Sequence, residues 1–145
     1  MKLYTIGFTQ KTAEEFFDLL KKNGVQRVID IRLYPGGQLA GFTKQADLRY
    51  FLRELIGCDY RHLSELTPTD ELLKGFRSDK NWQKYDPAFF RLMQQRGIPQ
   101  KLERSLFEEQ PCCLLCSEAT PEHCHRRLVA DLLASKWGGV TIIHL

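Results

Sequence analysis

Short apolar runs alternate along the chain with longer segments whose apolar positions recur every three to four residues. The first pattern is typical of buried strands, and the second of helices with one apolar face. Five strands are predicted, at residues 2–7, 26–32, 59–63, 112–116 and 140–145. Helices are predicted at residues 12–24, 43–57, 88–95, 100–109 and 121–136. Between Leu66 and Lys84 the pattern weakens, and we expect a loop or an irregular helix there.

Residues at the ends of two predicted helices support their limits. Thr12 is a suitable N-cap for the first helix, and Glu15, three residues later, completes a capping box. Gly24 suits the left-handed conformation that ends many helices. Before the last helix, Thr120 is a suitable N-cap and Pro121 fits the first turn.

Alternating strands and helices predict an α/β fold, with one compact domain over residues 1–145. We expect a mostly parallel central sheet of about five strands with helices on both faces. In such sheets ligands bind at the carboxyl ends of the strands, near the switch in strand order. Three predicted strand ends carry chemically distinctive residues, namely Gly7 followed by Thr9, Asp30 with Arg32, and Cys116 with Glu118.

Charge and composition narrow the function classes. The net charge is +3 and the pI is about 8.6, which suits an anionic ligand but falls short of a nucleic-acid-binding signature. The N-terminus does not read as a signal peptide, and no apolar run is long enough to span a membrane. The five cysteines are not spaced like a disulfide framework, so we expect reduced thiols and a cytoplasmic location.

The segment CSEATPEHCHRRL, residues 116–128, is the densest group of chemically active side chains. A helix N-terminus after Thr120 favours an anion, and Arg126 or Arg127 could strengthen the attraction. The alternative is a surface pair, because Glu122 and Arg126 are four residues apart. Anion binding at this helix N-terminus is favoured if Arg32, on a neighbouring strand, also reaches it.

The same segment invites comparison with a metal site and with a reactive thiol. Strand alternation points Cys113 and Cys116 to opposite faces, and His123 diverges from His125 on a helix, so we expect no metal and no cofactor. Cys116, at a strand end near a helix start, is a candidate nucleophile, with Cys124 close to it. The alternative is that these cysteines pack as small apolar side chains, as expected of the remaining three, Cys58, Cys112 and Cys113.

Asp30 and Glu118 are the candidate acid–base residues. A network of ion pairs with Arg32 and Arg126 is the plainer explanation, in which Asp30 positions an arginine. Two histidines near strands, His62 and His144, are expected to be structural, and so are the aromatic residues of the helix at 43–57.

Several of these residues match a known family from end to end. The chain carries Thr5-Ile6-Gly7, Asp30-x-Arg32, a proline loop at Pro35, Tyr60-x-His-Leu63, and a closing C-x-E-x(5)-C-H-R over residues 116–126. It resembles the domain-of-unknown-function family 488. The resemblance implies a single small α/β domain without an established activity. The chain departs from the family pattern at Phe8 and Thr9, where members often have His-Ser, and in its proline loop, which members usually build with a serine and an arginine.

The leading hypothesis is an enzyme or enzyme-like domain that binds an anionic small ligand, a nucleotide or a nucleic-acid end. The expected ligand-binding residues are Gly7, Thr9, Arg32, Thr120, Cys124, His125 and Arg126, and the expected catalytic residues are Glu118, Asp30 and Cys116. One alternative is a non-catalytic binding or regulatory module in which the C-H-R segment is structural. The other is a thiol- or metal-dependent activity at Cys116 and Cys124. Protein partners are not predicted, and no membrane association is expected.

Overall fold

The structure, a computed structural model, describes residues 1–37 and 41–145. Its strands are β1 (Lys2–Gly7), β2 (Arg27–Asp30), β3 (Asp59–His62), β4 (Cys112–Cys116) and β5 (Thr141–His144). Its α-helices are α1 (Ala13–Lys22), α2 (Gln45–Ile56), α3 (Asp70–Asp79), α4 (Trp82–Arg96), α5 (Ser105–Glu108) and α6 (His125–Trp137). Each predicted strand is present, and the predicted α/β alternation is confirmed.

All five strands are parallel, in the order β3-β2-β4-β1-β5. Because β4 lies between β2 and β1, the ends of three strands from distant parts of the chain meet in the middle of the sheet. In the register of β1 with β4, Gly7 lies beside Cys116. In the register of β2 with β4, Asp30 lies beside Leu115.

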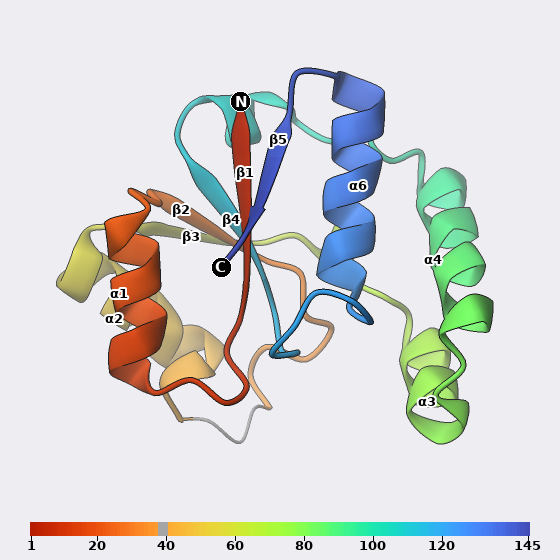
Figure 1. Ribbon diagram of the computed structural model, residues 1–145, viewed down its shortest axis with the longest axis horizontal. Coiled ribbons are helices and arrows are strands. Elements are labelled where there is room, and N and C mark those ends of the chain that lie inside the picture. Colours follow the sequence, from red (N-terminus) through yellow and green to blue (C-terminus); the bar gives the residue numbers. More distant parts are fainter. Residues whose placement is uncertain (38–40) are drawn as a thin grey trace.

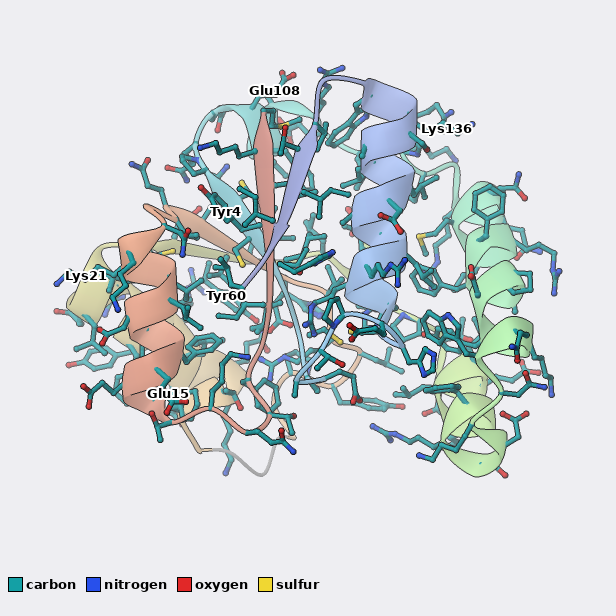
Figure 2. All side chains as sticks on the ribbon, viewed as in Figure 1. Tyr4, Glu15, Lys21, Tyr60, Glu108 and Lys136 are labelled. Carbon is teal, nitrogen blue, oxygen red and sulfur yellow. The ribbon has the colours of Figure 1, made fainter. Side chains whose placement is uncertain are left out.

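Helices cover both faces of the sheet (Figure 1). One apolar core joins α1 and α2 to the sheet through residues such as Phe16, Leu20 and Leu52. The other joins α4, α5 and α6 to the opposite face, with Phe89 and Phe107 among its buried members. Figure 2 shows the labelled charged side chains, among them Glu15, Lys21 and Lys136, on the outer sides of the helices. The predicted helices on both faces are confirmed.

Two helix predictions are wrong. Residues 66–84 hold an ordered helix, α3, which Thr69 caps by accepting a hydrogen bond from the Leu72 backbone N–H at 3.2 Å. Its apolar side chains, including Leu72 and Phe76, pack on the core although Gly75 interrupts the pattern. In the predicted helix at 100–109, only Ser105–Glu108 is α-helical.

The last helix also begins later than predicted. It starts at His125 rather than Pro121, with Cys124 as an N-cap in extended conformation, so Thr120 caps no helix. The local capping signal is overridden by burial, because Cys124, His125 and Arg126 all turn inward at this point. The surface pair with Glu122, the alternative to anion binding, does not form, since Arg126 is fully buried.

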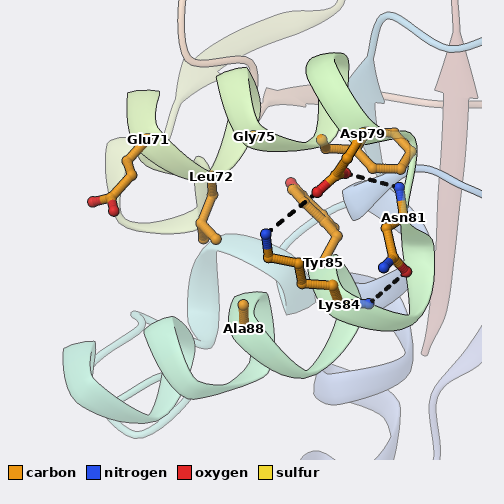
Figure 3. A pocket seen from close by; sticks show the side chains of 9 residues that line it. Glu71, Leu72, Gly75, Asp79, Asn81, Lys84, Tyr85 and Ala88 are labelled. Carbon is orange, nitrogen blue, oxygen red and sulfur yellow. Dashed lines mark hydrogen bonds and ion pairs between the residues drawn. The ribbon is translucent and has the colours of Figure 1, made fainter.

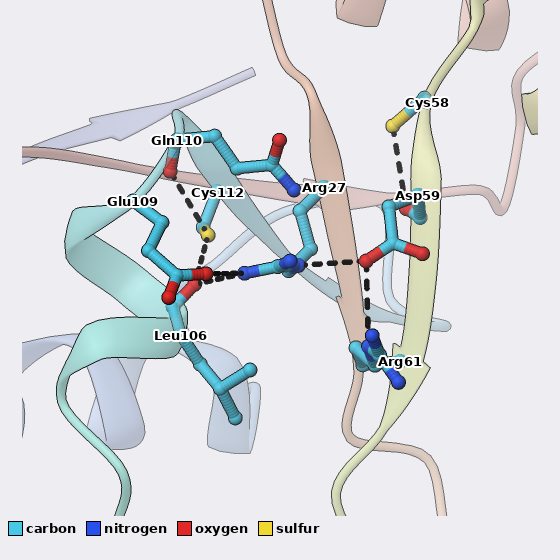
Figure 4. Close-up of polar contacts among 8 residues, drawn as sticks. All are labelled: Arg27, Cys58, Asp59, Arg61, Leu106, Glu109, Gln110 and Cys112. Atoms are coloured by element: carbon cyan, nitrogen blue, oxygen red, sulfur yellow. Dashed lines mark hydrogen bonds and ion pairs between the residues drawn. The ribbon is translucent and has the colours of Figure 1, made fainter.

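A polar cluster ties the opposite, amino-terminal end of the sheet together (Figure 4). Arg27, the first residue of β2, donates from Nε to Asp59 of β3 at 2.8 Å and from Nη1 to the Leu106 carbonyl at 2.6 Å. Asp59 also pairs with Arg61 at 3.3 Å, and Arg27 with Glu109 at 3.5 Å. This cluster links two strands to α5, far along the strands from the residues predicted to bind a ligand.

Candidate functional site

A cavity of about 310 Å³ lies at the carboxyl ends of β2 and β4. We call it the strand-end cavity. Three parts of the chain line it: residues 32–34 after β2, the region of α3 and the start of α4, and the segment 116–125 that joins β4 to α6. The connection from β4 passes to one face of the sheet, while those from β1 and β2 pass to the other. The cavity therefore lies beside the switch in strand order, where the sequence analysis expected a ligand.

A second hollow, of about 230 Å³, lies between α3 and α4 (Figure 3). Across it Lys84 pairs with Asp79 at 3.3 Å, and Asp79 accepts a hydrogen bond from the Asn81 backbone N–H at 2.9 Å. These contacts fasten the turn between the two helices. None of the residues predicted to act in a site lines this hollow.

Asp30 and Arg32 form a buried pair at the end of β2, as strand alternation predicts. Arg32 donates from Nε to Asp30 Oδ1 at 2.9 Å and from Nη2 to Oδ2 at 2.7 Å. Tyr60 donates its hydroxyl to Oδ2 at 2.6 Å. Arg32 Nη2 also donates to the Thr43 carbonyl at 2.7 Å, whereas the buried Nη1 has no hydrogen-bond partner among the described residues.

Cys116, Cys124 and His125 converge where β4 gives way to α6. Cys116 Sγ lies 3.4 Å from His125 Nδ1, and His125 Nε2 lies 2.7 Å from the Ile31 carbonyl oxygen. A carbonyl oxygen only accepts, so Nε2 carries the proton and donates it. In the neutral ring, the lone pair of Nδ1 then faces Cys116.

The two cysteine thiols differ in their tendency to ionise. A hydrogen bond from Cys124 lowers the pKa of Cys116 against the opposing effect of burial, and the backbone N–H of Glu118 and the charge of Arg126 add to the lowering. Burial raises the pKa of Cys124 well above its usual value, and the neighbouring Cys116 raises it further. Cys116 is therefore the thiol that ionises first.

Arg126 is the largest fully buried side chain, and it has no carboxylate partner among the described residues. Its Nη1 donates to the Glu118 carbonyl at 2.5 Å and contacts Cys124 Sγ at 3.6 Å, while Nε donates to Thr5 Oγ1 at 3.4 Å. Nη2 is buried without a partner in the described part of the chain. A buried guanidinium without a counter-ion is costly, and the Glu118 carbonyl, the Thr5 hydroxyl and Cys124 Sγ are the acceptors that contact it.

The structure separates the predicted site residues into two groups. Those that line the strand-end cavity are Arg32, Cys116, Glu118, Cys124 and His125. The remaining five, Gly7, Thr9, Asp30, Thr120 and Arg126, lie near it or support it without lining it, as far as the described residues show. Thr9 donates from its hydroxyl to the Ser117 carbonyl at 2.5 Å, which joins the ends of β1 and β4.

The model of the domain of unknown function DUF488 matches residues 12–133. The chain belongs to the DUF488 family. No curated protein and no solved structure matches it. The description of this family names no ligand and no reaction, and in this DUF488 protein the geometry of the site is what bears on its chemistry.

The wall of the strand-end cavity that α3 and α4 supply was not predicted from the sequence. Arg77 and Lys80 come from α3 and its C-cap, and Trp82 is the first residue of α4. The ring of Trp82 stacks on His123 with centroids 5.1 Å apart. The signal that could have found this helix was Thr69 followed by Leu72, Leu73 and Phe76, a capped apolar face. Across the described residues, no helix is long and apolar enough to cross a membrane.

Proposed function

We propose that the strand-end cavity binds a small anionic molecule. The observation that carries the proposal is Arg32, whose guanidinium is buried beside the cavity with Nη1 unpartnered among the described residues. Asp30 occupies the other two nitrogens and holds the group in a fixed orientation. A buried donor that lacks a partner is costly, and an acceptor atom of a ligand would satisfy it.

The charges around the cavity favour an anion. Besides Arg32, the cationic residues Arg77 and Lys80 line it, and no ion-pair partner is present for either one within residues 1–37 and 41–145. Glu118 is the one carboxylate among the lining residues that the structure describes. Because Asp30 and Arg32 neutralise each other, the electrostatic attraction for an anion comes mainly from Arg77 and Lys80. The free N–H donor of Arg32 would orient the bound anion through a hydrogen bond.

Size and shape narrow the ligand class. A volume of about 310 Å³ is at the lower end for small-molecule sites, which suits a compact anion or a mononucleotide better than a polymer. The exposed ring of His123, stacked on Trp82, offers a flat surface for a planar group. Glu118, exposed at the rim, is the proposed acid–base residue, whereas Asp30 positions Arg32.

The structural alternative also has a specific observation in its favour. Arg126 and His125 of the C-H-R segment are buried and bound to the backbone carbonyls of Glu118 and Ile31, as expected of residues that fix α6 to the sheet. Under this alternative the cavity binds no anion. The two proposals therefore differ in whether the protein binds an anion in the strand-end cavity, which can be measured.

Isothermal titration with inorganic phosphate and with nucleoside monophosphates tests the proposal. The double variant Arg77→Ala/Lys80→Ala should weaken binding at least about tenfold, which corresponds to about 1.4 kcal/mol. The matched control is Arg91→Ala/Lys136→Ala, which removes two exposed cations outside the cavity and should leave affinity unchanged. Equal loss in both double variants, or no binding by the unaltered protein at millimolar anion, would favour the structural alternative.

A further inference from the structure

Three potential metal ligands meet at one point of the strand-end cavity. Cys116 ends β4, Cys124 is the N-cap of α6, and His125 is the first residue of that helix. Their ligating atoms all lie within 4.8 Å of one another. No metal was predicted from the sequence, because alternation points Cys113 away from Cys116 and a helix would separate His123 from His125. Cys113 does lie on the other face of the sheet, but His123 precedes α6, and the turn between β4 and α6 brings Cys124 back to Cys116.

The observed spacing matches what a tetrahedral ion requires. With a metal–sulfur bond of about 2.3 Å and a metal–nitrogen bond of about 2.05 Å, sulfur and nitrogen ligands lie about 3.6 Å apart. Cys116 Sγ and His125 Nδ1 are 3.4 Å apart. This pair already has the separation of two ligands of one ion, and the Cys124 sulfur lies within 4.8 Å of both atoms.

The surroundings of the three residues prepare them as ligands. The Ile31 carbonyl accepts the Nε2 proton of His125 at 2.7 Å, which leaves the Nδ1 lone pair directed at the cluster. Arg126 Nη1 contacts Cys124 Sγ at 3.6 Å and supplies positive charge next to sulfur. Cysteine binds metals as the thiolate, so binding of an ion would release the proton that burial holds on Cys124.

We propose that Cys116, Cys124 and His125 form a binding site for a soft divalent cation of the zinc type, with the fourth coordination position facing the strand-end cavity. All three residues line the cavity, and no fourth ligand joins the group within the described residues. Three protein ligands and one open position are typical of catalytic rather than structural zinc sites. This proposal stands apart from anion binding, because it depends on none of Arg32, Arg77 and Lys80.

Titration of the reduced, untagged protein with Co²⁺ in the absence of added anions tests the site. We expect one equivalent bound per chain, a thiolate-to-metal charge-transfer band, and intense ligand-field bands of a four-coordinate ion. Zn²⁺ should displace the cobalt and abolish these bands, since zinc binds such sites more tightly than cobalt. A six-coordinate spectrum, or no charge-transfer band at one equivalent, would overturn the proposal.

Variants separate this site from adventitious binding to thiols. Cys116→Ala, Cys124→Ala and His125→Gln should each weaken Co²⁺ binding more than about 100-fold, beyond the 10–100-fold typical of losing a supporting residue. The matched control is Cys113→Ala, which removes a buried cysteine on the other face of the sheet and should bind cobalt normally. If a ligand variant fails to fold, as circular dichroism would show, X-ray absorption of the unaltered zinc-loaded protein decides the matter. Two sulfur neighbours are expected, and their absence contradicts the proposal.

Discussion

Arg32 makes a bidentate pair with the carboxylate of Asp30: its Nε donates to Oδ1 at 2.9 Å and its Nη2 donates to Oδ2 at 2.7 Å. The Arg32 and Asp30 side chains are 3% and 0% exposed, so both charges are removed from water. Tyr60 holds the same carboxylate at 2.6 Å. This arrangement fixes the guanidinium of Arg32, which follows β2 and lines the cavity, before any ligand binds.

Breaking this pair should be strongly destabilising. Arg32→Ala leaves a buried carboxylate without its counter-charge, so the free energy of unfolding should fall by about 3–5 kcal/mol. Denaturant unfolding followed by circular dichroism measures the change. The double variant Asp30→Leu/Arg32→Met should lose clearly less unfolding free energy than the sum of the losses in Asp30→Leu and Arg32→Met, because no lone charge remains. Additive losses would mean that the two residues are not coupled.

How far the sequence predicts this molecule depends on whether a feature is local. The capping box of α1 is local, and Thr12 and Glu15 bond each other's backbones at 3.1 and 3.3 Å as expected. The Asp30–Arg32 pair also follows from alternation along one strand. Gly57 ends α2 in the left-handed conformation, with φ at 60°.

Features that depend on burial could not be predicted from local patterns. The start of α6 follows from the inward turn of Arg126, whose partners, Thr5 and the Glu118 carbonyl, come from β1 and from the loop after β4. The meeting of Cys116 with Cys124 depends on the path of an irregular turn, for which strand or helix periodicity gives no rule. The cavity wall from α3 was missed because Gly75 and the surrounding charges weaken the apolar pattern.

Gly7 is required for the close approach of β1 to the loop after β4. A Cβ at this position would lie 1.6 Å from the Glu118 carbonyl oxygen and 2.8 Å from Arg126 Nη1. Gly7→Ala should therefore lower the free energy of unfolding by at least about 1–3 kcal/mol, as overpacking does. Gly75→Ala is the matched control, because its Cβ meets nothing within 4 Å and α3 gains about 0.5–1 kcal/mol from alanine. Chemical denaturation compares the two, and equal stability of Gly7→Ala and the unaltered protein contradicts the clash.

The amino-terminal cluster predicts a specific loss of stability in acid. Burial raises the pKa of Asp59, but the hydrogen bond from Arg27 and the charge of Arg61 outweigh it, so the pKa lies below the usual 3.8. A depressed pKa gives stability that is complete above the unfolded value and is lost as the pH falls through the folded one. Asp59→Asn should thus flatten the fall of unfolding free energy below about pH 4. Asp47→Asn, which removes an exposed carboxylate without an ion pair in the described residues, should change the slope little.

The five cysteines should differ sharply in their reaction with an alkylating reagent. Burial raises the pKa of Cys58 to about 12 and that of Cys112 to about 11, and it raises the pKa of Cys113 well above its usual value. Because the thiolate is the reactive form, these three should stay unmodified in the native protein at pH 8. Burial raises the pKa of Cys124 in the same way, so any early modification should fall on Cys116, whose pKa is lowered and which lines the cavity.

Peptide mapping after brief treatment with iodoacetamide measures the order of modification. Added Zn²⁺ should slow the reaction of Cys116, whereas Mg²⁺, which prefers oxygen ligands, should have no effect. Denatured protein, in which all five thiols react, provides the reference. Early labelling of Cys58 or Cys112 in the folded protein would contradict the order. Equal protection by both metal ions would show that zinc acts through general stabilisation and not through the cluster of Cys116, Cys124 and His125.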